Sequence, residues 1–181
     1  RKLYTMTPFQ IVDQPVGGEI EEGSPVILTG ETTTAENLSY QWYLDGEELA
    51  GETQNRLFIP EIQREQSGEY SLKISQEGFF LETDAASISV VGPPIIIEHP
   101  VAGEFEVGQT LLLSALASGT ADFQYQWILN GKPFFGATSK ELTIENLSES
   151  MAGDYAVKVT NEFGEAISEV ANTSVRFLDN D

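Results

Sequence analysis

The sequence contains one tripeptide twice, as Tyr40-Gln41-Trp42 and again, 85 residues later, as Tyr125-Gln126-Trp127. The same displacement aligns the chain from Pro15 to Val175 without a net insertion. A match of this length excludes coincidence and identifies an internal duplication. Each copy has about 90 residues, the size of one small domain. We therefore expect two domains, over residues 1–92 and 93–181.

Each copy has the alternating pattern that is typical of β-strands. Tyr70, Leu72 and Ile74, for example, alternate with more polar neighbours, and a period of two places such residues on one face of a sheet. Asp45-Gly46 and Asn130-Gly131 favour hairpin turns, because these residue types tolerate positive φ. Helical periodicity is nowhere sustained. The sequence predicts an all-β fold of two tandem, antiparallel Greek-key β-sandwiches.

The detailed residue pattern of the two copies resembles that of a known family. In the second copy Asn130-Gly131 is followed by Leu142-Thr143-Ile144, Gly153-Asp154-Tyr155 and Val159-Thr160-Asn161. With the Tyr-Gln-Trp motif, this pattern is similar to bacterial immunoglobulin-like repeats of the intermediate (I) set. The resemblance covers nearly the whole chain and implies tandem immunoglobulin-like sandwiches of a large surface or secreted protein. It is specific for the fold and says little about function, because this fold hosts many functions.

The resemblance assigns core positions to four aromatic residues. Trp42 and Trp127 should each fill the centre of a sandwich. Tyr70 and Tyr155 correspond to the tyrosine corner, whose hydroxyl bonds back to the preceding loop backbone. We expect all four to be structural residues.

The chain has no cysteine, so it can form neither a disulfide nor a Cys-ligated metal site. By spacing, the two cysteine positions of the family fall on Gly30 and Leu72 in the first copy and on Ala115 and Val157 in the second. Each pair sets a small residue against a branched apolar one, which we interpret as a volume-conserving substitute for the bridge. The core must then supply the roughly 2–4 kcal/mol that a disulfide contributes.

The chain is strongly acidic, with 29 Asp and Glu against 9 Lys and Arg and a net charge of −20. Both copies share the excess: 16 acids and 5 bases precede Pro93, and 13 acids and 4 bases follow from it. Such a charge repels nucleic-acid phosphates and anionic membrane surfaces. No apolar run approaches the roughly 18 residues of a membrane span. We expect no nucleic-acid partner and no membrane insertion.

The residues suited to catalysis form no recognisable motif. The only histidine is His99, and its counterpart in the first copy is Gln14, which cannot act in acid–base catalysis. One histidine is too few for a histidine-based zinc site. We therefore predict a protein that is not an enzyme, and we interpret His99 as an ordinary surface residue.

Calcium is the one cofactor for which the sequence offers ligands, since this ion prefers carboxylate and carbonyl oxygens. The candidate ligands are Asp13, Glu19, Glu21, Glu22, Glu98 and the terminal Asp179-Asn180-Asp181. No Asp-x-Asp-x-Asp-Gly loop is present. The prediction is therefore no cofactor and no metal site, with calcium as the remaining alternative.

Two pairs of adjacent phenylalanines are candidates for contact with a partner. They are Phe79-Phe80 and Phe134-Phe135. In an alternating strand one member of each pair should face inward and the other outward. Phe134 aligns with Leu49, an expected inward position, so Phe135 should be exposed. We take Phe79, Phe80 and Phe135 as possible partner-binding residues.

The copies are joined by Gly92-Pro93-Pro94, and two prolines favour extended backbone. This predicts an elongated rod with limited hinge motion. The start at Arg1, without an initiator methionine, suggests a monomeric fragment of a longer chain. The leading hypothesis is a non-catalytic extracellular or cell-surface module for adhesion or spacing, with a protein partner. The alternatives are a carbohydrate-binding accessory module of a secreted hydrolase and an intracellular elastic filament module of the muscle type.

Overall fold

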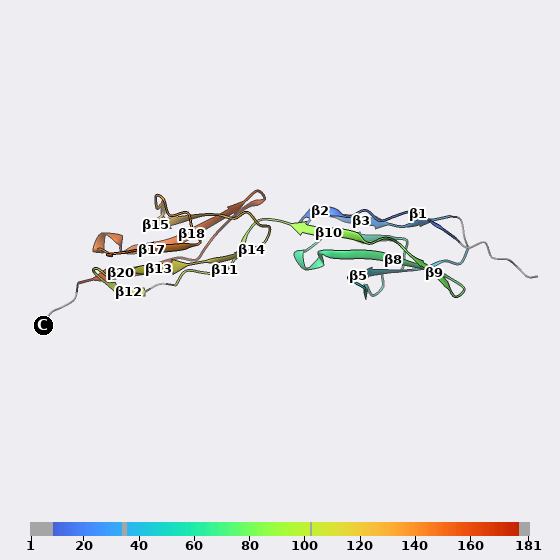
Figure 1. Cartoon of the computed structure of the whole chain (residues 1–181), viewed down its shortest axis with the longest axis horizontal. Coiled ribbons are helices and arrows are strands. Elements are labelled where there is room, and N and C mark those ends of the chain that lie inside the picture. Colours follow the sequence, from blue (N-terminus) through green and yellow to red (C-terminus); the bar gives the residue numbers. More distant parts are fainter. Residues whose placement is uncertain (1–8, 34–35, 102, 178–181) are drawn as a thin grey trace, which may run out of the picture. The chain divides into compact units, whose positions relative to one another are not determined.

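The computed structural model describes residues 9–33, 36–101 and 103–177. Residue contacts divide the chain between Val91 and Gly92 into two compact domains, each built from facing layers of strands (Figure 1). In the described part of the chain the only helical elements are two single 3-10 turns, η1 (Arg64–Gln66) and η2 (Glu149–Met151). The predicted all-β fold of two sandwiches is confirmed.

One layer of domain 1 is a six-stranded sheet. Its order is β2 (Gly18–Glu21), β10 (Ala86–Val91), β8 (Gly68–Gln76), β5 (Ser39–Leu44) and β6 (Glu47–Glu48), with β9 (Phe79–Glu82) paired to β8. The other layer consists of the pairs β1 (Ile11–Asp13) with β4 (Glu31–Thr32) and β3 (Val26–Thr29) with β7 (Arg56–Ile59). Strand β2 runs parallel to β10, whereas the other pairs are antiparallel.

Domain 2 repeats this arrangement. Its six-stranded sheet has the order β12 (Gly103–Glu106), β20 (Ala171–Arg176), β18 (Gly153–Asn161), β15 (Gln124–Leu129) and β16 (Lys132–Pro133), with β19 (Gly164–Ile167) paired to β18. The facing pairs are β11 (Ile95–Glu98) with β14 (Leu116–Ser118) and β13 (Leu111–Ser114) with β17 (Glu141–Ile144). The first strand of each domain thus begins in one layer and continues in the other.

The core of each domain is centred on a tryptophan that solvent does not reach. Trp42 and Trp127 are both 0% exposed. Their indole nitrogens donate hydrogen bonds of 2.9 Å to the carbonyls of Gln54 and Ser139, respectively. The one polar atom of each ring is therefore satisfied, which removes the penalty of burying it.

The tyrosine assigned to the corner in each domain is also buried. The Tyr70 hydroxyl donates a 2.7 Å hydrogen bond to the carbonyl of Gln66, and the Tyr155 hydroxyl donates one of the same length to Met151. Both acceptors lie in the 3-10 turns that precede β8 and β18. These bonds hold the turn against the strand that follows it.

The last strand of each domain is interrupted between its two segments, β9 and β10 or β19 and β20. At the break, the buried hydroxyls of Thr83 and Ser168 accept hydrogen bonds of 2.9 Å from the backbone N–H groups of Leu72 and Val157. The N–H groups of Thr83 and Ser168 donate back to the carbonyls of the same two residues. A side-chain oxygen here replaces a backbone acceptor, so the ladder continues across the irregularity.

Candidate functional site

The described residues assemble no metal centre. Among residues 9–33, 36–101 and 103–177, no group of three or more His, Cys, Asp or Glu side chains is placed to hold a metal ion. The candidate ligands Asp179 and Asp181 lie outside the described residues. Over the same part of the chain, no helix has the length and apolar character needed to cross a membrane.

His99 has a structural partner that the sequence did not reveal. Its Nδ1 accepts a 3.0 Å hydrogen bond from the backbone N–H of Glu169, at the break in the last strand of domain 2. In domain 1 the Gln14 Oε1 accepts a 2.9 Å bond from the N–H of Asp84 at the equivalent place. Both side chains sit where the first strand changes layer. His99 therefore serves as the hydrogen-bond acceptor for a backbone N–H, as Gln14 does. This contact does not place His99 in a catalytic group.

The segment that enters domain 2 is held by side chains of that domain. The N–H of Gly92 donates a 2.9 Å hydrogen bond to the Thr120 hydroxyl. The Asn161 amide donates to the carbonyls of Gly92 and Thr120, at 2.8 and 3.1 Å, and its oxygen accepts from the N–H of Phe163. Gly92 is thus bonded on both sides into domain 2. Asn161 stood out in the sequence only as part of the Val159-Thr160-Asn161 stretch, and its alignment with Gln76, another amide, was the available signal for these bonds.

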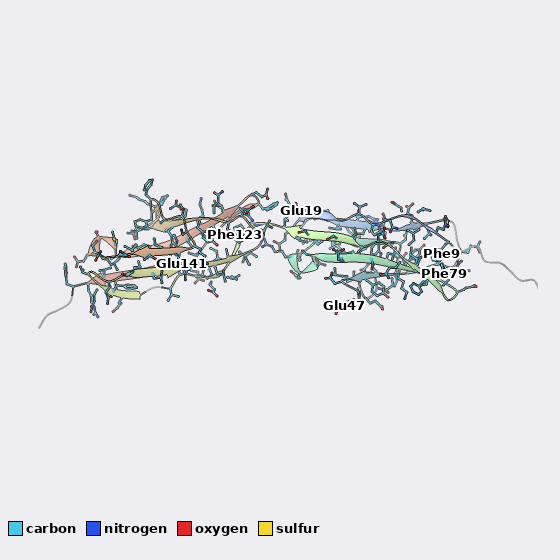
Figure 2. All side chains as sticks on the ribbon, in the orientation of Figure 1. Phe9, Glu19, Glu47, Phe79, Phe123 and Glu141 are labelled. Carbon is cyan, nitrogen blue, oxygen red and sulfur yellow. The ribbon has the colours of Figure 1, made fainter. Side chains whose placement is uncertain are left out.

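The structure places Phe79 and Phe80 on one hairpin of domain 1. The expected inward and outward alternation is wrong for this pair, because 43% of Phe79 and 55% of Phe80 remain exposed. Phe79 lies edge-on against the buried Phe9, with ring centroids 5.5 Å apart (Figure 2). The ammonium of Lys73 lies 4.3 Å from the centre of the Phe80 ring. Both rings therefore already have partners within the domain.

Phe135 is different, because no other side chain of the described residues covers it. It is fully exposed, whereas its neighbour Phe134 packs against the core of domain 2. Phe135 belongs to domain 2, whereas Phe79 and Phe80 belong to domain 1. Among the aromatic residues that the structure describes, Phe135 is the most exposed.

Comparison with known proteins supports the architecture. Residues 8–90 match the family model described as an immunoglobulin domain, and residues 94–172 match the immunoglobulin I-set domain. Among solved structures, the chain is similar to the first two immunoglobulin domains of DIP-gamma, with a TM-score of 0.77 and 16% identity. That alignment covers 94% of this chain and 98% of the other. Identity this low supports the fold alone.

Three curated relatives are animal proteins, from Caenorhabditis elegans and human. The muscle M-line assembly protein unc-89 of Caenorhabditis elegans is 29% identical over 168 residues, which are 85% of this chain and 2% of that protein. The human HEPACAM family member 2 is 25% identical over 126 residues, which are 63% of this chain and 27% of the relative. The chain therefore spans a small part of the relatives that it matches.

These relatives support the immunoglobulin part of the expected resemblance and give no support to its bacterial part. The core features quoted from the repeats are required by the fold, so they do not distinguish bacterial from animal sequences. With family matches over both halves and a sandwich in each, the chain belongs to the immunoglobulin-domain proteins and consists of two such domains in tandem.

Proposed function

We propose that this pair of domains is a non-catalytic module that spaces neighbouring domains of a longer protein and presents side chains to a protein partner. The class of its relatives supports this role, since unc-89 is named for muscle M-line assembly and another relative is a titin homolog. The similar DIP-gamma pair is known bound to an immunoglobulin domain of Dpr11. A fold of this kind can therefore serve as a protein-binding unit.

The observation that carries the spacing role is that the backbone is hydrogen-bonded within each domain directly before and after the domain boundary. The Val91 carbonyl accepts a 2.8 Å hydrogen bond from the N–H of Glu22 in domain 1. The next N–H, that of Gly92, is bonded to Thr120 in domain 2. Pro93 and Pro94 follow and restrict φ. A spacer needs a junction that resists bending, and these bonds, each within one domain, hold the backbone in place up to the domain boundary from both sides.

Removal of the contacts at Gly92 tests this role. In the double variant Asn161→Ala and Thr120→Val, the Gly92 N–H and carbonyl lose their side-chain partners. We expect the distribution of distances between spin labels, one on each domain, to broaden. The matched control is Gln76→Ala, because Gln76 aligns with Asn161 but donates to the Glu36 carbonyl inside domain 1. Equal distributions in the wild type and the double variant would remove the support for a stiff spacer.

Two cellular settings fit such a module, and the proposal favours the cell surface or extracellular space. The alternative is an intracellular filament, which the names of the nematode relatives favour. Asn37 and Asn146 begin Asn-x-Ser sequences and are exposed at turns, so both are suitable glycan acceptors in a secreted chain. Native protein that loses mass on treatment with peptide N-glycosidase would establish the extracellular setting. An unchanged mass would favour the filament.

A further inference from the structure

The segment of residues 131–140 differs in charge from the rest of domain 2. It contains Lys132 and Lys140 and no carboxylate, a net charge of +2, although Asp and Glu exceed Lys and Arg from Pro93 onward by 13 to 4. All its residues are exposed except Phe134 and Ala137, which are half-buried. The aligned segment of domain 1, residues 46–55, has three glutamates and no base, a net charge of −3. The two domains therefore present opposite charge at the same position of the fold.

Phe135 stands at the tip of this segment on a turn that is rigidly built. The N–H of Ala137 donates a 3.1 Å hydrogen bond to the Phe134 carbonyl, and Gly136 has φ of 77°, as the third position of a type II turn requires. The Phe134 N–H and Ala137 carbonyl bond to the backbone of Trp127. The Gln126 amide also donates to the Phe134 carbonyl, at 2.9 Å. The turn is thus bonded on both sides to the core strand β15.

Domain 1 shows that this turn does not need a phenylalanine. Its equivalent turn has Ala50 at the tip and keeps the same bonds: Glu52 N–H to the Leu49 carbonyl at 3.1 Å, and the Gln41 amide to the same carbonyl at 2.7 Å. Gly51 repeats the positive φ. Since alanine suffices to build the turn in domain 1, the phenyl ring of Phe135 is not required for the turn to form in domain 2. An exposed ring on a preordered support loses little conformational entropy when it is bound.

We propose that Phe135, with Lys132 and Lys140, is a docking site for a protein surface that has an apolar pocket and an acidic rim. This rests on the protein-binding part of the proposed function and names its site and partner chemistry. The ring supplies the apolar anchor, and the two ammonium groups complement carboxylates around the pocket. The net charge of −20 does not prevent this contact, because salt screens charges beyond a Debye length of about 8 Å. The attraction between the two ammonium groups and nearby carboxylates of the partner is therefore stronger than the repulsion from distant acidic residues.

The probe is a library of short random peptides displayed on phage and selected against the intact chain. Selected peptides are then measured by fluorescence polarisation against the wild type and Phe135→Ala. We expect peptides enriched in Asp and Glu, with at least one large apolar residue. They should bind the wild type about tenfold or more tightly than the variant, as an interface anchor does. Binding should also weaken in the variant with Lys132→Gln and Lys140→Gln, and at higher salt.

Two controls make the result specific to this turn. Ala50→Phe places the same ring on the acidic turn of domain 1 and should not restore binding to Phe135→Ala. Thermal unfolding of Phe135→Ala should match that of the wild type, because Ala50 occupies this position in domain 1 without loss of the turn.

Three outcomes would overturn the docking site. These are a library that yields no peptide dependent on Phe135, selected peptides that are basic, and self-association of the wild type that Phe135→Ala abolishes, since the occupant would then be a second copy. Peptides that bind elsewhere on the chain would refute this site and leave protein binding intact. The spacing role is judged separately by the Asn161 and Thr120 variant.

Discussion

Gly30 and Leu72 pack so closely that a Cβ atom on Gly30 would lie 2.8 Å from Cδ2 of Leu72. Leu72 is completely buried and pairs directly with Trp42 across β8 and β5. In domain 2 the aligned residues are Ala115 and Val157, both buried. Domain 1 therefore combines the smaller residue at the first position (Gly) with the larger residue at the second (Leu). Domain 2 combines the larger residue at the first position (Ala) with the smaller residue at the second (Val). Close packing beside the tryptophan stands where a disulfide stands in many immunoglobulin domains.

Gly30→Ala should destabilise domain 1 by about 1–3 kcal/mol, because the added methyl overlaps a buried side chain. Leu72→Val alone should cost about 1 kcal/mol through lost apolar contact. The double variant reproduces the pair found in domain 2 and should be more stable than the sum of the two changes predicts. Urea unfolding, followed at the indole N–H signal of Trp42, measures all three. Strict additivity would contradict a direct contact between the two positions.

Alkaline pH should weaken both domains through their buried tyrosines. Burial raises the pKa of Tyr155 above its ordinary value of 10.0, and burial together with the charge of Asp45 raises the pKa of Tyr70. The folded state therefore favours the neutral phenol. This stabilisation is fully present below pH 10 and is lost as pH rises through the folded-state pKa. Unfolding free energies measured at increasing pH above 10 should fall, and should fall less in Tyr70→Phe.

Asp45→Asn separates the two causes. Asn130 holds the aligned position in domain 2, where its side-chain oxygen accepts a 2.9 Å bond from the Asp154 N–H, as Asp45 does from the Glu69 N–H. The substitution therefore keeps the turn and removes the charge. We expect the pKa of Tyr70 to fall while that of Tyr155 stays fixed, measured by NMR of the tyrosine rings. An unchanged pKa of Tyr70 would mean that burial alone raises it.

The parts of this fold that follow a period could be predicted from the sequence. The alternation of apolar and polar side chains, and the two copies of the Tyr-Gln-Trp motif, indicate where the strands lie and which face is buried, because burial recurs every second residue. The exposure of Phe135 followed from the alignment of Phe134 with Leu49. The opposite charge of the turn at Phe135 was also readable, as Lys132 and Lys140 against three aligned glutamates, but no periodic pattern pointed to it.

Hydrogen bonds from side chains to backbone could not be predicted in the same way. Three side chains make hydrogen bonds to backbone groups of other segments of the chain: His99, Ser168 at the break in the last strand, and Asn161. Such bonds need a single side chain at one irregular position, so they leave no periodic signal. The alternation rule also failed at Phe79 and Phe80: Phe79 contacts the buried Phe9, Phe80 contacts Lys73, and both rings remain partly exposed.

Thr173→Val should stabilise domain 2. Thr173 is 2% exposed, and its hydroxyl has no hydrogen-bond partner among the described residues. Domain 1 has Ile88 at the aligned position, equally buried. Valine has the shape of threonine without the unsatisfied polar group, so we expect a gain of about 1–2 kcal/mol in urea unfolding. Ile88→Val is the matched control and should lower the stability of domain 1 by about 0.5–1.5 kcal/mol. A loss of stability in Thr173→Val would show that the hydroxyl is satisfied.

The equivalence of His99 and Gln14 leads to the last prediction. Each accepts one backbone N–H at the break in the last strand, from Glu169 and Asp84 respectively. His99→Gln keeps an acceptor there and should leave the unfolding free energy of domain 2 nearly unchanged. His99→Ala leaves the Glu169 N–H without its side-chain acceptor and should cost about 0.5–1 kcal/mol, because the site is exposed and water replaces part of the bond.

Hydrogen exchange at a single amide separates this local bond from general destabilisation. The Glu169 N–H should exchange more rapidly in His99→Ala than in His99→Gln, while the Asp84 N–H in domain 1 keeps its wild-type rate in both. Gln14→Ala should reverse the pattern, with faster exchange at Asp84 alone. Exchange of Glu169 at one rate in all variants would show that His99 does not hold this group. The duplicated fold makes each domain the internal reference for the other, since the same backbone break is bridged by different side chains.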